Sequence, residues 1–363
     1  MKNGLSKKTL ILASLVVLAV LVVVLVVARP GAKDTSGLKY ASELNLFNWS
    51  NYMPQSVLDK FKEKYGIKVN YSTFSSNEEM LAKIQAGGAS QYDLAVASDY
   101  MIQIMLKQKD PLLQPIDLKN IPNFQNIAAQ YKNLSFDPDN QYTVPYMCGT
   151  ALIAVNTAIV KGQVQSYKDL WDSKLKDSLV VLDDQRAIIG MALKKLGYSL
   201  NEVDERKLLQ AKAELQKLLP NIKAYDSDSP KTLLINGEAS CGLIWSAEAS
   251  LAKRDKPEIQ IVFPTEGMYL WQDNFFIPNG APHKKEAELF VNFILDPEVS
   301  AMISKELPYT NPNAEALKYV DEAYRNDIAA NPPKAELDKG EYLKDVAQAT
   351  QLYDRIWSEI KQQ

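Results

Sequence analysis

The chain has 363 residues, a formal net charge of −3 at pH 7, 46% apolar residues and 23% charged residues. These values are typical of a globular protein that is long enough to form two lobes with buried cores. Lys2, Lys7, Lys8 and Arg29 lie in or beside an N-terminal leader, so the remainder is more acidic than the total. That balance argues against nucleic acid as a partner and favours cations.

Residues 1–33 have the pattern of an export sequence. Lys2, Lys7 and Lys8 precede an almost wholly apolar stretch, Thr9–Ala28, and a basic segment before an apolar one is typical of a signal sequence. The stretch also matches the roughly 20 residues of a membrane-spanning helix, so it could remain as an anchor. There is no Cys near the end of this stretch, which excludes bacterial lipid attachment. We expect a protein at the periplasmic or extracytoplasmic face of the membrane, with cleavage or retention of residues 9–28 left open.

After a polar linker, predicted strands and helices alternate. The predicted strands are 44–49, 67–71, 92–97, 142–145, 151–156, 179–182, 241–245, 259–263 and 269–277. The predicted helices begin after Pro54 and Ser76 and run over 99–108, 185–196 and 204–219, with a loop-rich passage at 109–141. This alternation indicates an α/β fold with largely parallel sheets. The long strand 269–277 could return the chain to the first of two lobes, and a cleft between lobes is a preferred ligand site.

Aromatic rings stand beside carboxylates at separate points along the chain. Trp245 is followed at three residues by Glu248, Trp271 at two by Asp273, and Trp49 at three by Tyr52. Ring faces attract cations, and a desolvated carboxylate makes charge-assisted hydrogen bonds to N–H donors. The combination is what a site for a linear organic cation requires.

Each of these residues also has a structural interpretation. Trp245 and Trp271 could be core residues at strand ends, and Asp183 or Asp184 could cap the helix that begins near Gln185. Asp273 is harder to explain in that way, because a buried acid in an apolar strand needs a partner.

The cysteines and the histidine give no cofactor signal. Cys148 and Cys241 lie in apolar strand-like stretches, where buried free thiols are favoured, although export would permit a disulfide. With His283 they form no metal constellation of the zinc kind. We expect no metal and no cofactor.

The segment Leu46-Phe47-Asn48-Trp49-Ser50-Asn51-Tyr52-Met53-Pro54 resembles the opening strand and turn of bacterial polyamine-binding proteins, the extracytoplasmic receptors of spermidine/putrescine ABC importers. The resemblance continues in order through 66–69, 92–94, 144–146, 243–245, 271–273 and 308–312. It implies the two-lobed type II periplasmic binding protein fold, with the ligand in the interlobe cleft. Lobe 1 would comprise 43–146 plus 269–313, lobe 2 would comprise 147–268, and 314–363 would be a helical segment packing across both.

The resemblance also implies a set of ligand-binding residues and no catalytic ones. The implied set is Trp49, Tyr52, Ser98, Tyr100, Asp184, Trp245, Glu248, Trp271, Asp273 and Tyr309. Ala187 departs from the family, which commonly has Glu there, whereas Glu248 is similar to the acid of putrescine-preferring members. The preference between spermidine and putrescine therefore stays open. Implied partners are the polyamine and the ABC permease subunits, and we expect a monomer.

Three other functions remain to be weighed. Asp184 with Asp273 could form the carboxylate pair of a glycoside hydrolase, although no nucleophile elbow, P-loop or Rossmann fingerprint is present. A receptor of the same fold could bind another organic cation, and an anion receptor would need an arginine such as Arg186 near the cleft. A tethered polyamine sensor is the third alternative.

Overall fold

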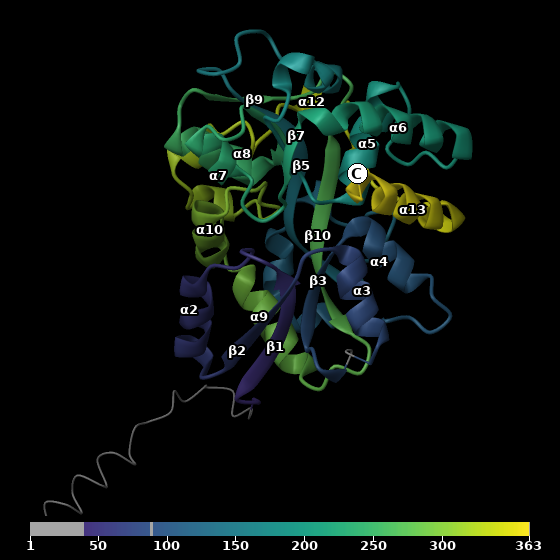
Figure 1. The fold of residues 1–363 in the computed structure, drawn as a ribbon. Coiled ribbons are helices and arrows are strands. Elements are labelled where there is room, and N and C mark those ends of the chain that lie inside the picture. Colours follow the sequence, from purple (N-terminus) through teal and green to yellow (C-terminus); the bar gives the residue numbers. More distant parts are fainter. Residues whose placement is uncertain (1–39, 88–89, 363) are drawn as a thin grey trace, which may run out of the picture.

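The computed structural model describes residues 40–87 and 90–362 (Figure 1). The leader, including the apolar stretch 9–28, lies outside this part of the chain. Within the described ranges no helix is long and apolar enough to cross a membrane.

The first lobe is built on three parallel strands: β1 (Glu43–Trp49), β2 (Lys68–Phe74) and β3 (Leu94–Ser98). Helices α2 (Gln55–Tyr65) and α3 (Asn77–Gln85) connect them, and α4 (Asp99–Leu106) follows β3. The loop-rich passage then holds β4 (Leu113–Gln114) and short 3-10 helices at 118–120, 122–126 and 129–131. The elements follow the predicted alternation closely.

The second lobe repeats the pattern. Strands β6 (Leu179–Val181), β7 (Ile222–Tyr225) and β8 (Cys241–Trp245) are parallel, and β9 (Ile259–Val262) pairs with β5. The helices are α5 (Gln185–Lys195), α6 (Glu205–Leu218), α7 (Lys231–Asn236) and α8 (Ser246–Asp255), with 3-10 helices at 167–171, 173–175 and 219–221.

Two long strands cross between the lobes (Figure 1). They are β5 (Thr143–Asn156) and β10 (Tyr269–Pro278), which lie side by side in the order β2-β1-β3-β10-β5-β8-β6-β7. The prediction of separate strands at 142–145 and 151–156 was wrong, because β5 runs unbroken through both. The prediction of largely parallel sheets holds within each lobe, for β1, β2 and β3 and for β6, β7 and β8. The crossing strands pair antiparallel with each other, with β3 and with β8.

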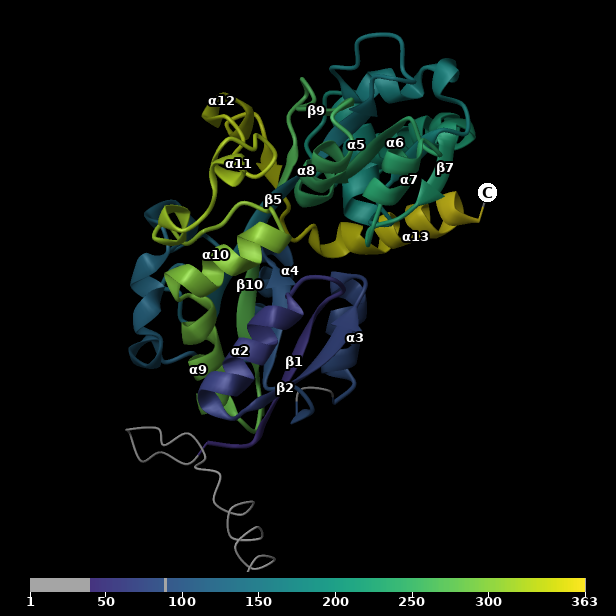
Figure 2. The same cartoon turned by 90° about the vertical axis from the view of Figure 1, so that its left-hand side faces the viewer.

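The helices after β10 contribute to both lobes. Helix α9 (Lys284–Ile294) contributes Phe290, whose ring meets Phe61 of α2 edge to face at 4.9 Å in the lobe 1 core. Helix α10 (Pro297–Glu306) is followed by 3-10 helix 316–318, α11 (Glu322–Arg325), α12 (Lys334–Leu337), β11 (Glu341–Tyr342) and 3-10 helix 347–349. The last helix, α13 (Thr350–Lys361), packs against α5 and α6 along the edge of lobe 2 that faces lobe 1 (Figure 2). The exact lobe boundaries stay a prediction.

Local signals in the sequence explain several element ends. Gly66 ends α2 in the left-handed conformation with φ 72°, which glycine adopts without a steric penalty. Ser76 caps α3 by accepting from the Glu79 backbone N–H. Cys148 and Cys241 are both buried free thiols, as the apolar strand context favoured.

Candidate functional site

A cavity lies between the lobes and encloses about 790 Å³ of space not filled by protein, part of it open to solvent. It is lined by Trp49, Ser50, Asn51, Tyr52, Ser75, Asn77, Ser98, Asp184, Ser227, Asp228, Trp245, Ala247, Glu248, Tyr269, Trp271, Asp273, Leu307 and Tyr309. Nine of the ten residues in the set implied by resemblance are among them, the exception being Tyr100. A site drawn from both lobes can change its shape when the lobes move.

The fold explains why residues distant in the sequence meet here. The parallel strands β1, β3, β6 and β8 all end at the cleft, so residues at or just after their carboxyl ends line the cavity. Crevices outside the carboxyl ends of strands are the usual ligand sites of α/β sheets. On β10, Tyr269, Trp271 and Asp273 are two residues apart and therefore share one face.

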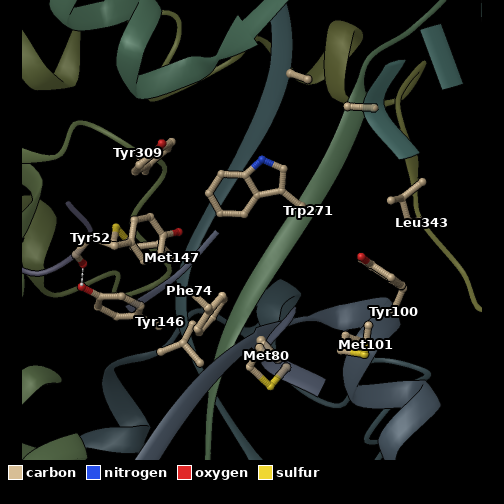
Figure 3. Close-up of a cluster of buried hydrophobic side chains, with 14 of the residues drawn as sticks. Tyr52, Phe74, Met80, Tyr100, Met101, Tyr146, Met147, Trp271, Tyr309 and Leu343 are labelled. Atoms are coloured by element: carbon tan, nitrogen blue, oxygen red, sulfur yellow. Dashed lines mark hydrogen bonds between the residues drawn. The ribbon is translucent and has the colours of Figure 1, made fainter. Parts of the chain in front are cut away.

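The rings form a connected aromatic wall. Trp271 lies 5.2 Å from Tyr309 and 6.1 Å from Trp245 between ring centroids, and Tyr309 lies 5.5 Å from Tyr52. Figure 3 shows the Trp271 indole projecting from β10 toward Tyr52 and Tyr309, with Tyr100 on the other side of β10 in this view. The two indoles meet at 87°, edge to face. Edge-to-face packing suits the ring quadrupoles.

Asp273 is the most deeply placed acid of the cavity. Asp273 is 5% exposed, and its Oδ1 accepts a hydrogen bond of 2.7 Å from the Ser98 hydroxyl. A shift of register in the β5–β10 ladder follows it directly, between Asp273 and Asn274; such irregularities re-aim side chains near sites. Burial raises the pKa of Asp273 to about 6, opposed by the hydroxyls of Ser98 and Tyr52. A cationic ligand beside Asp273 would favour the ionised carboxylate and offset this desolvation penalty.

Asp184 lies across the cleft at the start of α5. It caps the helix by accepting from the Ala187 N–H at 2.8 Å, so the structural interpretation is confirmed without excluding a second role, because a carboxylate has a further oxygen. Burial raises the pKa of Asp184, opposed by that N–H and by Arg186. Arg186 donates to the Lys344 carbonyl and to Asn201 and is not a lining residue. It is therefore not placed to receive an anionic ligand.

Glu248 is placed differently from the other acids. It lies in the first turn of α8 beside Trp245 and is paired with Lys231 at 2.8 Å. Asp228, at the exposed rim, is the fourth lining acid. Among the described residues that line the cavity there are four carboxylates and no lysine, arginine or histidine. The charged groups of the lining are therefore all acidic, and one of them, Glu248, is already paired with Lys231.

Comparison with known proteins agrees with this architecture. A family model described as bacterial extracellular solute-binding protein matches residues 56–332, which is most of the chain. The chain belongs to this family. It is 37% identical over 319 residues to the spermidine/putrescine-binding periplasmic protein of Salmonella typhimurium, covering 88% of this chain and 91% of that protein.

Solved structures extend the family likeness to three dimensions. A structure described as a putative spermidine/putrescine ABC transporter from Listeria monocytogenes has 33% identity and a TM-score of 0.85, covering 88% of this chain and 99% of that one. The spermidine/putrescine ABC transporter substrate-binding protein of Streptococcus pneumoniae has 35% identity and a TM-score of 0.74, covering 89% and 99%. The two-lobed fold of extracellular solute-binding proteins is thus confirmed.

Within this solute-binding fold, Tyr100 stands behind the cavity wall. Its hydroxyl donates to Glu78 at 3.1 Å and accepts from Asn77 at 3.2 Å, and Asn77 also donates to Ser98. Burial, and then the charge of Asp184, raises the pKa of Glu78. Tyr100 therefore positions groups of the wall, whereas Asn77 lines it directly.

Sequence reasoning missed several lining residues. Tyr269 could have been found, since it alternates with Trp271 and Asp273 in the predicted strand. Asn77 directly follows Ser76, where a helix is predicted to begin soon after a strand, which is also a usable signal. Ser227 and Asp228 follow β7, a strand of four residues with no buried member, and short half-exposed strands give no clear pattern.

Proposed function

We propose that this protein captures a polyamine, spermidine or putrescine, outside the cytoplasmic membrane and delivers it to the permease of an ABC importer. The observation that carries the proposal is the cavity itself, with four carboxylates, no cationic side chain among its described lining residues, and a wall of aromatic rings. The names of the relatives in Salmonella and Streptococcus support the choice of polyamine. The protein would act as a monomer and without catalysis.

The chemistry of the ligand matches the cavity. A polyamine carries ammonium groups separated by methylenes, and removing such charges from water is expensive unless each meets a carboxylate. Asp273 from β10 and Asp184 from lobe 2 would each receive an ammonium group. Trp271 and Tyr309 would contact the methylenes, and ring faces also attract cations. Closure of the lobes would exclude water and strengthen each charge–charge contact.

Calorimetric titration of the full-length chain in mild detergent tests the proposal. Saturable one-to-one binding of spermidine or putrescine is expected, with no binding of arginine, whose carboxylate would face the acids of the cavity. The ligand recovered after binding should be unaltered, since a hydrolase or other enzyme would convert its substrate. Absence of binding by either polyamine would overturn the proposal.

A substitution outside the set of lining residues should also impair binding. Gly149 on β5 pairs with Trp271, and a Cβ at this position would lie 2.3 Å from Trp271 Cζ2. Gly149→Ala should therefore displace the indole and weaken polyamine binding about tenfold, at the 1–3 kcal/mol scale of overpacking. Gly162→Ala is the matched control, because an added Cβ there meets nothing within 4 Å. Equal affinities of the two variants in the same titration would show that the Trp271 position does not matter.

A further inference from the structure

Glu248 is held by an ammonium group of the protein itself. Lys231 Nζ donates to both carboxylate oxygens of Glu248, each at 2.8 Å. Glu248 is 8% exposed and lines the cavity. The side chain of Lys231 is 26% exposed and is not a lining residue. The lysine therefore neutralises a carboxylate of the cavity wall from behind.

The ion pair with Glu248, and not the helix α7 to which Lys231 belongs, explains why a lysine is favourable at this position. Lys231 is the first residue of α7, after Pro230, which provides no side-chain cap. A cation at a helix N-terminus is disfavoured by the helix dipole, whereas Glu248, in the first turn of α8, is favoured there. Lys231 follows a loop that forms part of the cavity wall through Ser227 and Asp228.

That loop is fixed to its surroundings. The Ser227 hydroxyl accepts from the Asp183 backbone N–H at 2.9 Å, and Asp226 accepts from the backbone N–H groups of Asp228 and Ser229 at 2.9 and 3.0 Å. Lys231 therefore follows a hydrogen-bonded loop that forms part of the cavity wall.

The lining acids differ in what already compensates their charge. Asp273 accepts from a hydroxyl and Asp184 from a backbone N–H. Among the described residues, Glu248 is the lining acid with a lysine or arginine within 4.0 Å, and Asp184, Asp228 and Asp273 have none. A bound ammonium group gains more from an uncompensated buried carboxylate than from one already in an ion pair.

We propose that Lys231 is a specificity-determining residue that withholds Glu248 from the ligand. With Lys231 present, the interior of the cavity offers Asp273 and Asp184 to two ammonium groups, whereas Asp228 lies at the exposed rim, where water screens its charge. A third ammonium group, as in spermidine, finds no uncompensated acid at the Glu248 position. This inference rests on the proposed polyamine function and concerns the choice between a diamine and a triamine.

The test is the ratio of the affinities for spermidine and putrescine, measured by calorimetry. Lys231→Met keeps most of the side-chain length and removes the charge. The ratio should move toward spermidine by about tenfold, because Glu248 becomes available. In the double variant Lys231→Met/Glu248→Gln the ratio should return to that of the unchanged protein, since the effect acts through Glu248.

A second variant keeps the inference testable if Lys231→Met does not fold. Glu248→Gln leaves the Lys231 ammonium unpaired at the wall, so binding should weaken more for spermidine than for putrescine. Equal losses for both ligands, or an unchanged ratio in folded Lys231→Met, would overturn the inference. A shift that persists in the double variant would do so too. If the unchanged protein binds neither polyamine, the proposed function itself fails, which is a distinct result.

Discussion

Replacing Asp273 with asparagine should weaken the binding of spermidine and of putrescine by about thirtyfold or more. Asp273 is 5% exposed and has no cationic partner among the described residues, so its charge is available to the ligand. Removing one partner of a buried, hydrogen-bonded charge pair costs about 2–5 kcal/mol, much of it because the other charge stays buried without compensation. Calorimetric titration measures the loss directly.

The same substitution should stabilise the protein without ligand. Burial raises the pKa of Asp273 from 3.8 to about 6, so keeping it ionised in the folded state at pH 8 costs about 3 kcal/mol at most. Asparagine carries no charge, and its carbonyl oxygen can still accept from Ser98. In thermal melts at pH 8 without polyamine, Asp273→Asn should unfold above the unchanged protein. Saturating polyamine should raise its melting temperature by less than it raises that of the unchanged protein.

Asp137 provides the matched control. It is a buried acid outside the cavity, and its carboxylate accepts from the backbone N–H groups of Gln141, Tyr142 and Thr143. Asp137→Asn should lower stability, since part of this acceptor is replaced by a donor, and should leave polyamine affinity unchanged. If Asp273→Asn behaved in the same way, Asp273 would be a structural residue and the proposed ligand contact would be wrong.

Much of the site follows from the positions of strand ends in the sequence. Trp49, Ser98 and Trp245 each end a strand that an apolar run predicts, and parallel strands bring their carboxyl ends to one edge. Asp273 stands out because an acid within an apolar strand needs a partner. The resemblance added Tyr309, which the local sequence alone presents as an ordinary loop tyrosine between prolines.

Other features depend on contacts that the sequence does not display. Gly149 lies within the single strand β5 and makes room for the Trp271 indole of the neighbouring strand. The pairing of Lys231 with Glu248 spans β8, and Lys231 belongs to a six-residue helix, too short to show a helical period. The sequence therefore presented Glu248 as a free acid, although its charge is already balanced.

Lowering the pH from 8 to 5 should weaken polyamine binding and, over the same interval, stabilise the protein without ligand. The pKa of Asp273 is raised by burial to about 6 from 3.8, so below pH 6 the folded state holds a proton that the unfolded state lacks. Stability then rises as the pH falls, and protonated Asp273 no longer attracts ammonium. The pKa values of Asp184 and Glu248 are also raised, chiefly by burial, and act in the same direction.

Acids whose pKa is lowered in the folded state do not change the expected trend in stability between pH 8 and pH 5. Glu214, for example, has its pKa held below 4.5 by hydrogen bonds to Lys195 and Lys217, so its stabilising effect is lost only at lower pH. Thermal melts should be recorded at pH 8, 7, 6 and 5, each with and without spermidine. The difference between the two melting temperatures should become smaller as the pH falls. Asp273→Asn should melt with a weaker dependence on pH. A ligand-induced rise in melting temperature that stayed constant from pH 8 to pH 5 would mean that the ammonium is bound by groups other than Asp273.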